Sequence, residues 1–192
     1  GVSANVGDNM ESMVLVTESE GFSRVVEGST NDQPGWEFDS YGIRLTRAPT
    51  GTVRIKVVPA GMSPEDEAKG FRDLEFFTAP NGTSLGFNAL TGVAIAPVLE
   101  FTNLNWATTQ FVYFKAANSF TDPITLKQFN DTASEGKRFV FINHTLKDSL
   151  DPNYAAAKML SVKVLMEDND RDGVIVTPSG RDNVVLENGL SL

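Results

Sequence analysis

The chain has 192 residues, of which 41% are hydrophobic and 21% are charged, and this composition excludes a disordered segment and suits one domain-sized core. Its formal net charge of −9 opposes binding to nucleic acid and to anionic lipid surfaces, and no apolar run is long enough to cross a bilayer. Cysteine is absent, which excludes disulfides and thiolate metal sites.

The beginning of the chain recurs near its end. The run Val14-Leu-Val-Thr-Glu-Ser is restated as Val174-Ile-Val-Thr-Pro-Ser, and Asp8-Asn9 as Asp168-Asn169, both at a spacing of 160 residues. A fixed period of this size indicates tandem domains, since solenoid repeats are much shorter. We therefore expect an excerpt of an array, in which residues 1–12 end the preceding repeat, 13–170 form one repeat, and 171–192 are a linker with the first strand of the next.

Apolar and polar residues alternate along most of this repeat, which is the pattern of half-buried strands. In chain order the pattern predicts strands over 13–17, 24–27, 40–46, 52–58, 99–102, 110–115, 138–145 and 160–166. Short strands in this number, separated by turn signals, favour an all-β sandwich.

The strands 40–46 and 52–58 flank the turn-like residues 47–51, and we expect them to form a hairpin. A period of two sends three apolar side chains of each strand to one face and the basic side chains to the other. The expected inward residues are Tyr41, Ile43, Leu45, Val53, Ile55 and Val57, and the expected outward ones are Arg44, Arg54 and Lys56.

Residues 61–97 interrupt this rhythm. Ser63 can cap a helix, Pro64 suits its first position, and the acidic residues 65–67 favour its positive end, so a short helix is predicted there. The remainder carries four large apolar residues between 71 and 77 and is too apolar for a free linker. We expect an insertion that packs against the sandwich.

Six segments in a characteristic order carry a resemblance to a known family. They are Val-Val-Glu-Gly at 25–28, the runs 39–55 and 99–114, Ser-Glu-Gly at 134–136, Ile-Asn-His-Thr at 142–145 and Asp-Asn-Asp at 168–170. Together they resemble the Calx-beta domain of repetitive bacterial surface proteins, over nearly the whole repeat. The resemblance implies an immunoglobulin-like antiparallel β-sandwich that binds calcium at one end. Two stretches depart from the family: 61–97 is longer than its usual loop, and the region 120–129 is expanded.

By the same resemblance, acidic residues from three loops would bind calcium. These residues are Glu27, then Asp131 and Glu135, then Asp168 and Asp170; Asp122 could equally supply the ligand assigned to Asp131. The chemistry agrees, because calcium takes about 6–8 oxygen ligands and because clustered carboxylates repel one another without a cation.

The run Asp168-Asn-Asp-Arg-Asp-Gly173 also matches the first half of an EF-hand loop. The match ends at the twelfth position, where Ser179 replaces the bidentate Glu. We therefore favour an interdomain calcium site, in which Asp172 faces the next repeat. The preceding junction has Met10 in place of Asp170 and Ser12 in place of Asp172, so the junctions of the array need not bind metal equally well.

Three single residues have both a functional and a structural interpretation. Trp36 and Trp106 could stack on sugars, but Trp106 stands in a turn before a strand, where tryptophan is more often an anchor over the core. Trp36 lies in a polar loop and is expected to be the more exposed of the two. His144, the single histidine, is expected as a hydrogen-bonded surface or rim residue without catalytic neighbours.

An enzyme is not expected, because the absence of cysteine and the single histidine leave few nucleophile–base pairs, and no glycine-rich phosphate loop is present. We expect a structural or adhesive repeat of a large secreted or cell-surface protein, a calcium-stabilised spacer in an adhesin, filament or surface matrix. Its expected partners are neighbouring repeats, and other copies if an exposed strand such as 174–176 completes a neighbour's sheet. The alternative is a glycan- or protein-binding module that uses the insertion 61–97.

Overall fold

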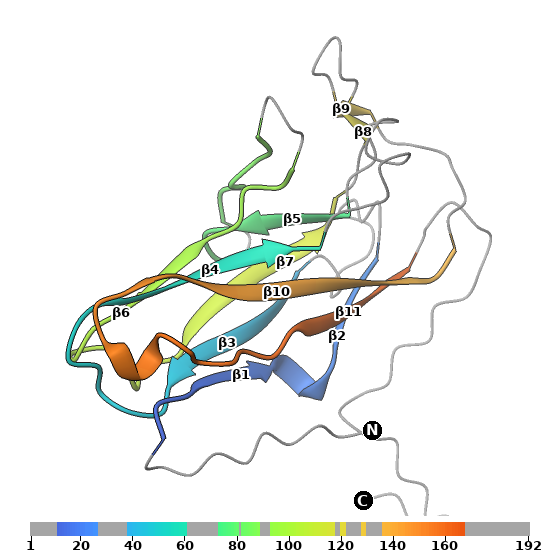
Figure 1. Cartoon of the computed structure of the whole chain (residues 1–192). Coiled ribbons are helices and arrows are strands. Elements are labelled where there is room, and N and C mark those ends of the chain that lie inside the picture. Colours follow the sequence, from blue (N-terminus) through green and yellow to red (C-terminus); the bar gives the residue numbers. More distant parts are fainter. Residues whose placement is uncertain are drawn as a thin grey trace, which may run out of the picture.

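The computed structural model describes residues 11–26, 38–60, 73–80, 82–88, 93–117, 120–121, 128–129 and 136–167, and strands dominate these ranges (Figure 1). In chain order the elements are β1 (Val14–Glu18), the 3-10 turn η1 (Ser19–Gly21), β2 (Ser23–Val26), β3 (Asp39–Leu45), β4 (Val53–Pro59), β5 (Leu74–Phe77), β6 (Val98–Phe101), β7 (Gln110–Ala116), β8 (Phe120–Thr121), β9 (Gln128–Phe129), β10 (Arg138–Ser149), the 3-10 turn η2 (Pro152–Tyr154) and β11 (Val162–Glu167).

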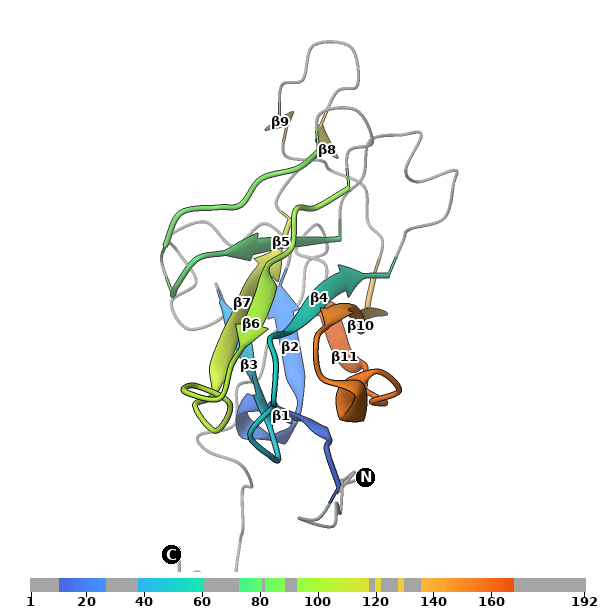
Figure 2. The ribbon, with the colours of Figure 1, turned by 60° about the vertical axis from the view of Figure 1, so that its left-hand side comes forward.

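Two sheets lie face to face (Figures 1 and 2). Sheet A has the strand order β1-β3-β7-β5, and sheet B has the order β2-β11-β10-β4-β6. The short strands β8 and β9 pair with each other in the connection between β7 and β10, in the region that the sequence marked as expanded. The predicted all-β sandwich is confirmed, and the eight expected strands correspond to β1, β2, β3, β4, β6, β7, β10 and β11.

The chain changes sheets directly after its first strand. β1 pairs with β3 in sheet A, whereas β2 pairs with β11 in sheet B. Gly21 turns the chain at a φ of 79°, which costs glycine little. Asp39 holds the two halves of the switch together, because its carboxylate accepts hydrogen bonds from Ser19 Oγ (2.8 Å) and from the Arg24 backbone N–H (2.7 Å). β2 runs parallel to β11. Sheet B is therefore mixed, whereas the resemblance implied purely antiparallel sheets.

The predicted hairpin of β3 and β4 is wrong. β3 pairs with β1 and β7, whereas β4 pairs with β6 and β10, so the link between them crosses from sheet A to sheet B. The predicted side-chain directions are nevertheless confirmed: the inward set is buried, and Arg44 and Lys56 are exposed with Arg54 half-buried. Two strands that face each other across a core show the same alternation as two strands of a hairpin, and the sequence pattern does not distinguish these arrangements.

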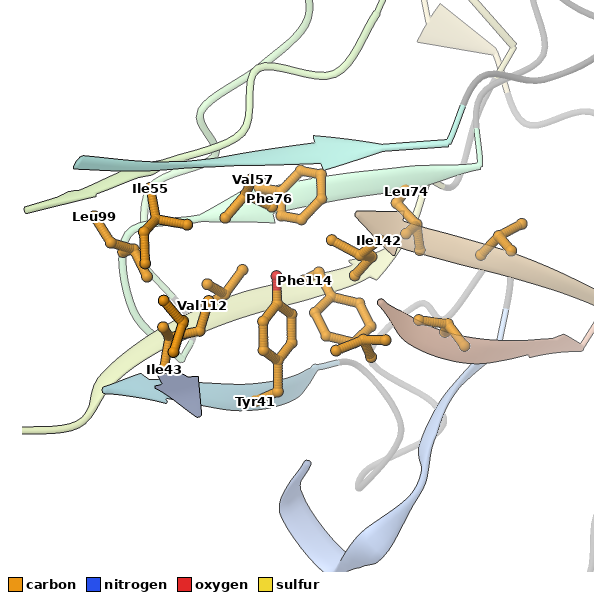
Figure 3. Close-up of a cluster of buried hydrophobic side chains, with 14 of the residues drawn as sticks. Tyr41, Ile43, Ile55, Val57, Leu74, Phe76, Leu99, Val112, Phe114 and Ile142 are labelled. Atoms are coloured by element: carbon orange, nitrogen blue, oxygen red, sulfur yellow. The ribbon is translucent and has the colours of Figure 1, made fainter. Parts of the chain in front are cut away.

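Inward side chains of both sheets form one hydrophobic core (Figure 3). Tyr41 and Phe114 of sheet A lie at its centre, with ring centroids 6.0 Å apart. Sheet B supplies Ile55, Val57 and Ile142 on the opposite side. Each such side chain stabilises the fold by about 1.5–3 kcal/mol through its removal from water.

The predicted insertion contributes a strand of its own to sheet A. β5 is an edge strand paired with β7, and Leu74 and Phe76 point into the core. After β5 the chain forms two isolated bridges, Phe77 with Ser84 and Phe87 with Ala94, before it enters β6. Leu85, Ala94 and Ala96 pack against the core, so this part of the insertion does pack on the sandwich, between the edge strands of the two sheets.

Some sequence predictions concern residues outside the described ranges. These are the short helix that begins near Ser63, the linker and strand at 171–192, and, apart from Glu11 and Ser12, the end of the preceding repeat.

Candidate functional site

The sandwich has two ends of different chemistry. At one, the Glu167 end, β2 finishes at Val26 and β11 finishes at Glu167, and these two residues are register partners. The opposite end, the Tyr154 end, contains the start of β1 at Val14, which pairs with the end of β3 at Leu45. The described chain therefore enters the sandwich at the Tyr154 end and leaves it at the Glu167 end (Figure 1).

All six predicted calcium ligands lie outside the described residues: Glu27, Asp131, Glu135, Asp168, Asp170 and Asp172. The structure does place the chain next to several of them. Val26 precedes Glu27 and pairs with Glu167, which precedes Asp168. Arg138 follows Glu135 by three residues and pairs with Met166. These acidic residues therefore adjoin the ends of three neighbouring strands of sheet B, β2, β11 and β10.

Glu167 is a buried carboxylate at this end, with 4% of its surface exposed. It forms ion pairs with Arg24 and with Lys137, whose Nζ lies 2.6 Å from Oε1. Burial raises the pKa of Glu167, but the hydrogen bonds and charges of Arg24 and Lys137 outweigh burial, so the pKa lies below its usual value. Glu167 is therefore ionised and already neutralised by two protein cations.

A second ion pair at the same end joins the two sheets. Arg138 at the start of β10 in sheet B binds Asp73, which stands just before β5 in sheet A, with Nη2 and Oδ1 3.1 Å apart. The backbone carbonyl of Asp73 also accepts a hydrogen bond from the Ala117 N–H (3.0 Å). Charged side chains therefore connect the sheets at the Glu167 end.

Among the described residues, no three Asp, Glu or His side chains lie close enough together to hold a metal ion. Of the acidic residues that the structure describes toward the Glu167 end, Asp73 and Glu167 are bound to basic side chains, and Asp39 accepts hydrogen bonds from Ser19 and from the Arg24 backbone. A calcium site here would therefore take its ligands from the segments that follow β2 and β11 and precede β10.

The Tyr154 end is held by hydrogen bonds to backbone groups. Tyr154 Oη donates to the Arg47 carbonyl (2.6 Å), and Asp151 accepts from the Thr50 backbone N–H (2.8 Å) and the Asn153 N–H (2.8 Å). The hydrogen bond from the Thr50 N–H is the main reason that the pKa of Asp151 lies below its usual value, although burial opposes it. The sequence reading missed this group, although an Asp directly before a Pro, as at 151–152, is a recognised start of a helical turn.

His144 is buried between the sheets, with 9% exposed, and the predicted surface or rim position is wrong. Its Nδ1 lies 2.7 Å from the Leu160 carbonyl, so Nδ1 carries the proton and Nε2 accepts from Tyr41 Oη at 2.9 Å. Burial lowers the pKa of His144 and raises that of Tyr41, so both side chains are neutral at pH 7. Because Tyr41 belongs to sheet A and His144 to sheet B, this hydrogen bond crosses the core.

The interpretation of Trp106 as an anchor is confirmed. Its side chain is partly buried against the core, and its backbone carbonyl accepts a hydrogen bond from the Leu45 N–H (2.9 Å). Trp36 lies outside the described residues.

Comparison with known proteins yields one weak structural similarity. No family model and no curated protein matches the sequence. A solved structure of the Calx CBD1 domain in its apo form is similar over 82% of this chain and 99% of that chain, with 12% identity and a TM-score of 0.39. This similarity is too low to carry an argument, so the sandwich assignment rests on the strand pairing described above.

No helix in the described part of the chain is long and apolar enough to span a membrane.

Proposed function

We propose that this chain is a non-enzymatic spacer repeat of a secreted or cell-surface protein, stabilised by calcium at the Glu167 end. The observation that carries the proposal is the placement of Val14 and Glu167 at opposite ends of the sandwich. Repeats joined through opposite ends follow one another along a line, whereas repeats joined at one end would fold back on each other. The sequence recurrence at 160 residues supplies the successive repeats.

Calcium at the Glu167 end is supported by strand register and by sequence. The register pairs Val26 with Glu167 and Arg138 with Met166, so the segments that contain Glu27, Glu135 and Asp168 adjoin neighbouring strands. These residues also match the acidic positions of the Calx-beta domain that the sequence resembles. Calcium prefers several carboxylate oxygens at once, and when bound it would neutralise their mutual repulsion and restrain the exit of the chain.

The spacer role is tested by comparing the shapes of one repeat and of two fused repeats. In small-angle X-ray scattering with calcium, the maximum dimension of the two-repeat chain should be about twice that of the single repeat. In chelator the distribution of distances should broaden as the junction loosens. A two-repeat chain that is barely longer than one repeat in calcium would contradict an end-to-end spacer.

The metal role is tested by titration calorimetry with calcium. We expect binding to the wild type and its loss in Glu27→Gln/Asp168→Asn, which removes two of the carboxylates next to the register pair. The matched control is Glu100→Gln, a carboxylate on β6 that binds Arg54 at 2.7 Å and lies toward the Tyr154 end. A double variant that binds calcium as the wild type does would overturn the proposed ligands.

A binding module is the second candidate, and one observation favours it. In the described part of the insertion, Val93 and Ile95 are 42% and 46% exposed while Ala94 and Ala96 pack inward, so two apolar side chains point to solvent from a segment anchored on the core. A glycan array probed with the wild type and with Trp36→Ala tests this candidate. Reproducible binding that requires Trp36 would replace the pure spacer role.

A further inference from the structure

Two leucines at the Tyr154 end are the most exposed large hydrophobic residues that the structure describes. Leu104 is 90% exposed and Leu150 is 74% exposed. Leu104 lies in the loop between β6 and β7, and Leu150 directly follows β10. The last residues of β6 and β10, Phe101 and Ser149, both pair with Val53 at the start of β4. The two loops therefore share one end of the sandwich, as Figure 2 shows, and we call the two residues the end leucines.

The end leucines stand on loops that hydrogen bonds fix to the end of β3 and to the link that follows it. In the first loop, the Trp106 carbonyl accepts from the Leu45 N–H (2.9 Å). In the second, the Leu150 N–H donates to the Thr52 carbonyl (2.9 Å). A Cβ at Gly51 would lie 2.6 Å from the Leu150 Cβ, so glycine allows this close approach. The exposed leucines are thus presented by anchored loops.

The chain that enters at the Tyr154 end is bound to the same place. The Thr46 N–H donates to the Met13 carbonyl (3.0 Å), and Thr46 Oγ1 accepts from the Met13 N–H (2.9 Å). The same hydroxyl donates to the Glu11 carbonyl (2.7 Å). The entering chain contributes only backbone groups to these bonds, and every junction sequence has such groups. Residues 11–13 are therefore part of the Tyr154 end and do not act as a loose tether.

The recurrence at 160 residues locates the end of the preceding repeat. Gly7 stands one period before Glu167, where β11 ends, and apolar residues at 2, 4 and 6 stand where β11 has buried ones. Residues 8–10 therefore separate that last strand from Glu11. The four steps from Gly7 to Glu11 reach at most about 14 Å, compared with about 10 Å between packed sheets. Neighbouring repeats are thus close enough to touch.

We propose that the end leucines pack against the Glu167 end of the preceding repeat and fix the angle between neighbouring repeats. The inference rests on the proposed end-to-end spacer and names the surface that stiffens its junctions. The short linker determines the occupant, because it holds the Glu167 end of one repeat beside the Tyr154 end of the next. The Glu167 end carries apolar surface as well, since Phe38, directly before β3, is only half-buried.

An apolar contact would give the junction a restraint that calcium alone does not supply. Burial of large hydrophobic side chains is favourable, and linked domains move relative to each other unless such a contact holds them. The junction before this repeat has Met10 and Ser12 where the next has Asp170 and Asp172. The end leucines would therefore hold that junction even with fewer carboxylates.

The inference is tested in a chain of two repeats, made by joining residue 173 to Val14 of a second copy, which preserves the period of 160 residues. Because the chain contains no cysteine, Lys56→Cys in both repeats places one spin label on an exposed position of each. Double electron–electron resonance in calcium should give one narrow distribution of distances. Leu104→Ser/Leu150→Ser in the second repeat should widen it about twofold or more, because the junction then moves freely.

The matched control carries the same two substitutions in the first repeat, whose Tyr154 end has no folded neighbour. It should keep the narrow distribution, and it controls for any effect of the substitutions on folding. A broad distribution in the wild type, around a distance of one repeat length, would leave a flexible spacer and overturn the inference alone. A narrow distribution in the second-repeat variant would also overturn it. A mean distance shorter than one repeat would mean that the repeats fold back, which contradicts the proposed spacer itself.

Discussion

The two ends of the sandwich are held together by different kinds of interaction. At the Tyr154 end, a tyrosine hydroxyl and the Asp151 carboxylate bind backbone groups of the link between β3 and β4. At the Glu167 end, the contacts are ion pairs between side chains, Glu167 with Arg24 and Lys137, and Asp73 with Arg138. The Tyr154 hydrogen bond joins uncharged groups and depends on packing, whereas the ion pairs at the Glu167 end depend on charge and therefore on ions and pH. Asp151, whose pKa folding also lowers, makes the Tyr154 end sensitive to low pH but gives it no ion pair that salt could screen.

This difference indicates how one domain can be rigid at its Tyr154 end and respond to calcium at its Glu167 end. The Tyr154 end fixes the crossing between the sheets without charged partners for Tyr154, so changes of salt should affect it little. The Glu167 end adjoins the segments that carry the candidate calcium ligands, and its own carboxylates are already neutralised by arginine and lysine. Calcium should therefore act on the segments beyond the strands and on the junction between repeats, and the sandwich itself should stay folded without it.

The largest expected effect comes from Tyr154, which is fully buried. Tyr154→Ala should lower the free energy of unfolding by about 3–5 kcal/mol through the cavity it leaves. Tyr154→Phe keeps the ring but loses the hydrogen bond to the Arg47 carbonyl, and it should cost about 1–2 kcal/mol. Urea unfolding at low and high salt measures both, and neither loss should change with salt. A loss that disappears in high salt would mean that the Tyr154 end is held electrostatically after all.

A smaller effect, sensitive to salt, is expected at Glu167. Glu167→Gln should cost about 1–2 kcal/mol, since it removes the buried carboxylate charge from the ion pair with Arg24, while the exposed Lys137 loses little. Folding lowers the pKa of Glu167 below 4.5, so its contribution is complete above about pH 4.5 and is lost as the pH falls through the lowered value. The control Asp148→Asn breaks an exposed pair and should barely matter. An equal cost at pH 7 and at pH 2 would contradict an ionic role for Glu167.

The smallest expected effect lies between the two ends, at His144. Folding lowers its pKa below 6.5, so the unfolded chain takes up a proton at a higher pH than the folded one. Stability should therefore fall as the pH drops below 6.5, by at most about 1.4 kcal/mol per pH unit. Unfolding of the wild type and of His144→Asn between pH 7 and pH 5.5 measures the difference in slope. Parallel curves would show that His144 does not couple folding to pH.

Alternation along the strands predicted the fold class and the buried faces, but not which strands pair. Tyr41, Ile43 and Leu45 point inward because of a local period of two, which any partner strand would satisfy. The crossing between β3 and β4 and the parallel pair of β2 with β11 depend on contacts between distant residues. The sequence does not predict β5 as a strand, because Phe76 and Phe77 are adjacent and the four residues show no alternation.

For the functional residues, too, local sequence pattern did not predict contacts between distant parts of the chain. The burial of His144 was not available from its strand: it shares a face with Val140 and Ile142, but Phe139 and Phe141 on the other face are apolar too and are exposed. The partners of Glu167 were not available, because Arg24 is separated from it by 143 residues along the chain. The six candidate calcium ligands remain predictions, supported by the strand register beside them and by the resemblance of the sequence.

The most direct test of the calcium-stabilised spacer is thermal unfolding of the whole chain in calcium and in chelator, for the wild type and for Asp168→Ala/Asp170→Ala. The account predicts a higher melting temperature in calcium for the wild type and none of this increase in the double variant, with both proteins still folded in chelator. Identical curves for the wild type in calcium and in chelator would contradict it, and would leave the acidic residues beyond the Glu167 end as solvated loops.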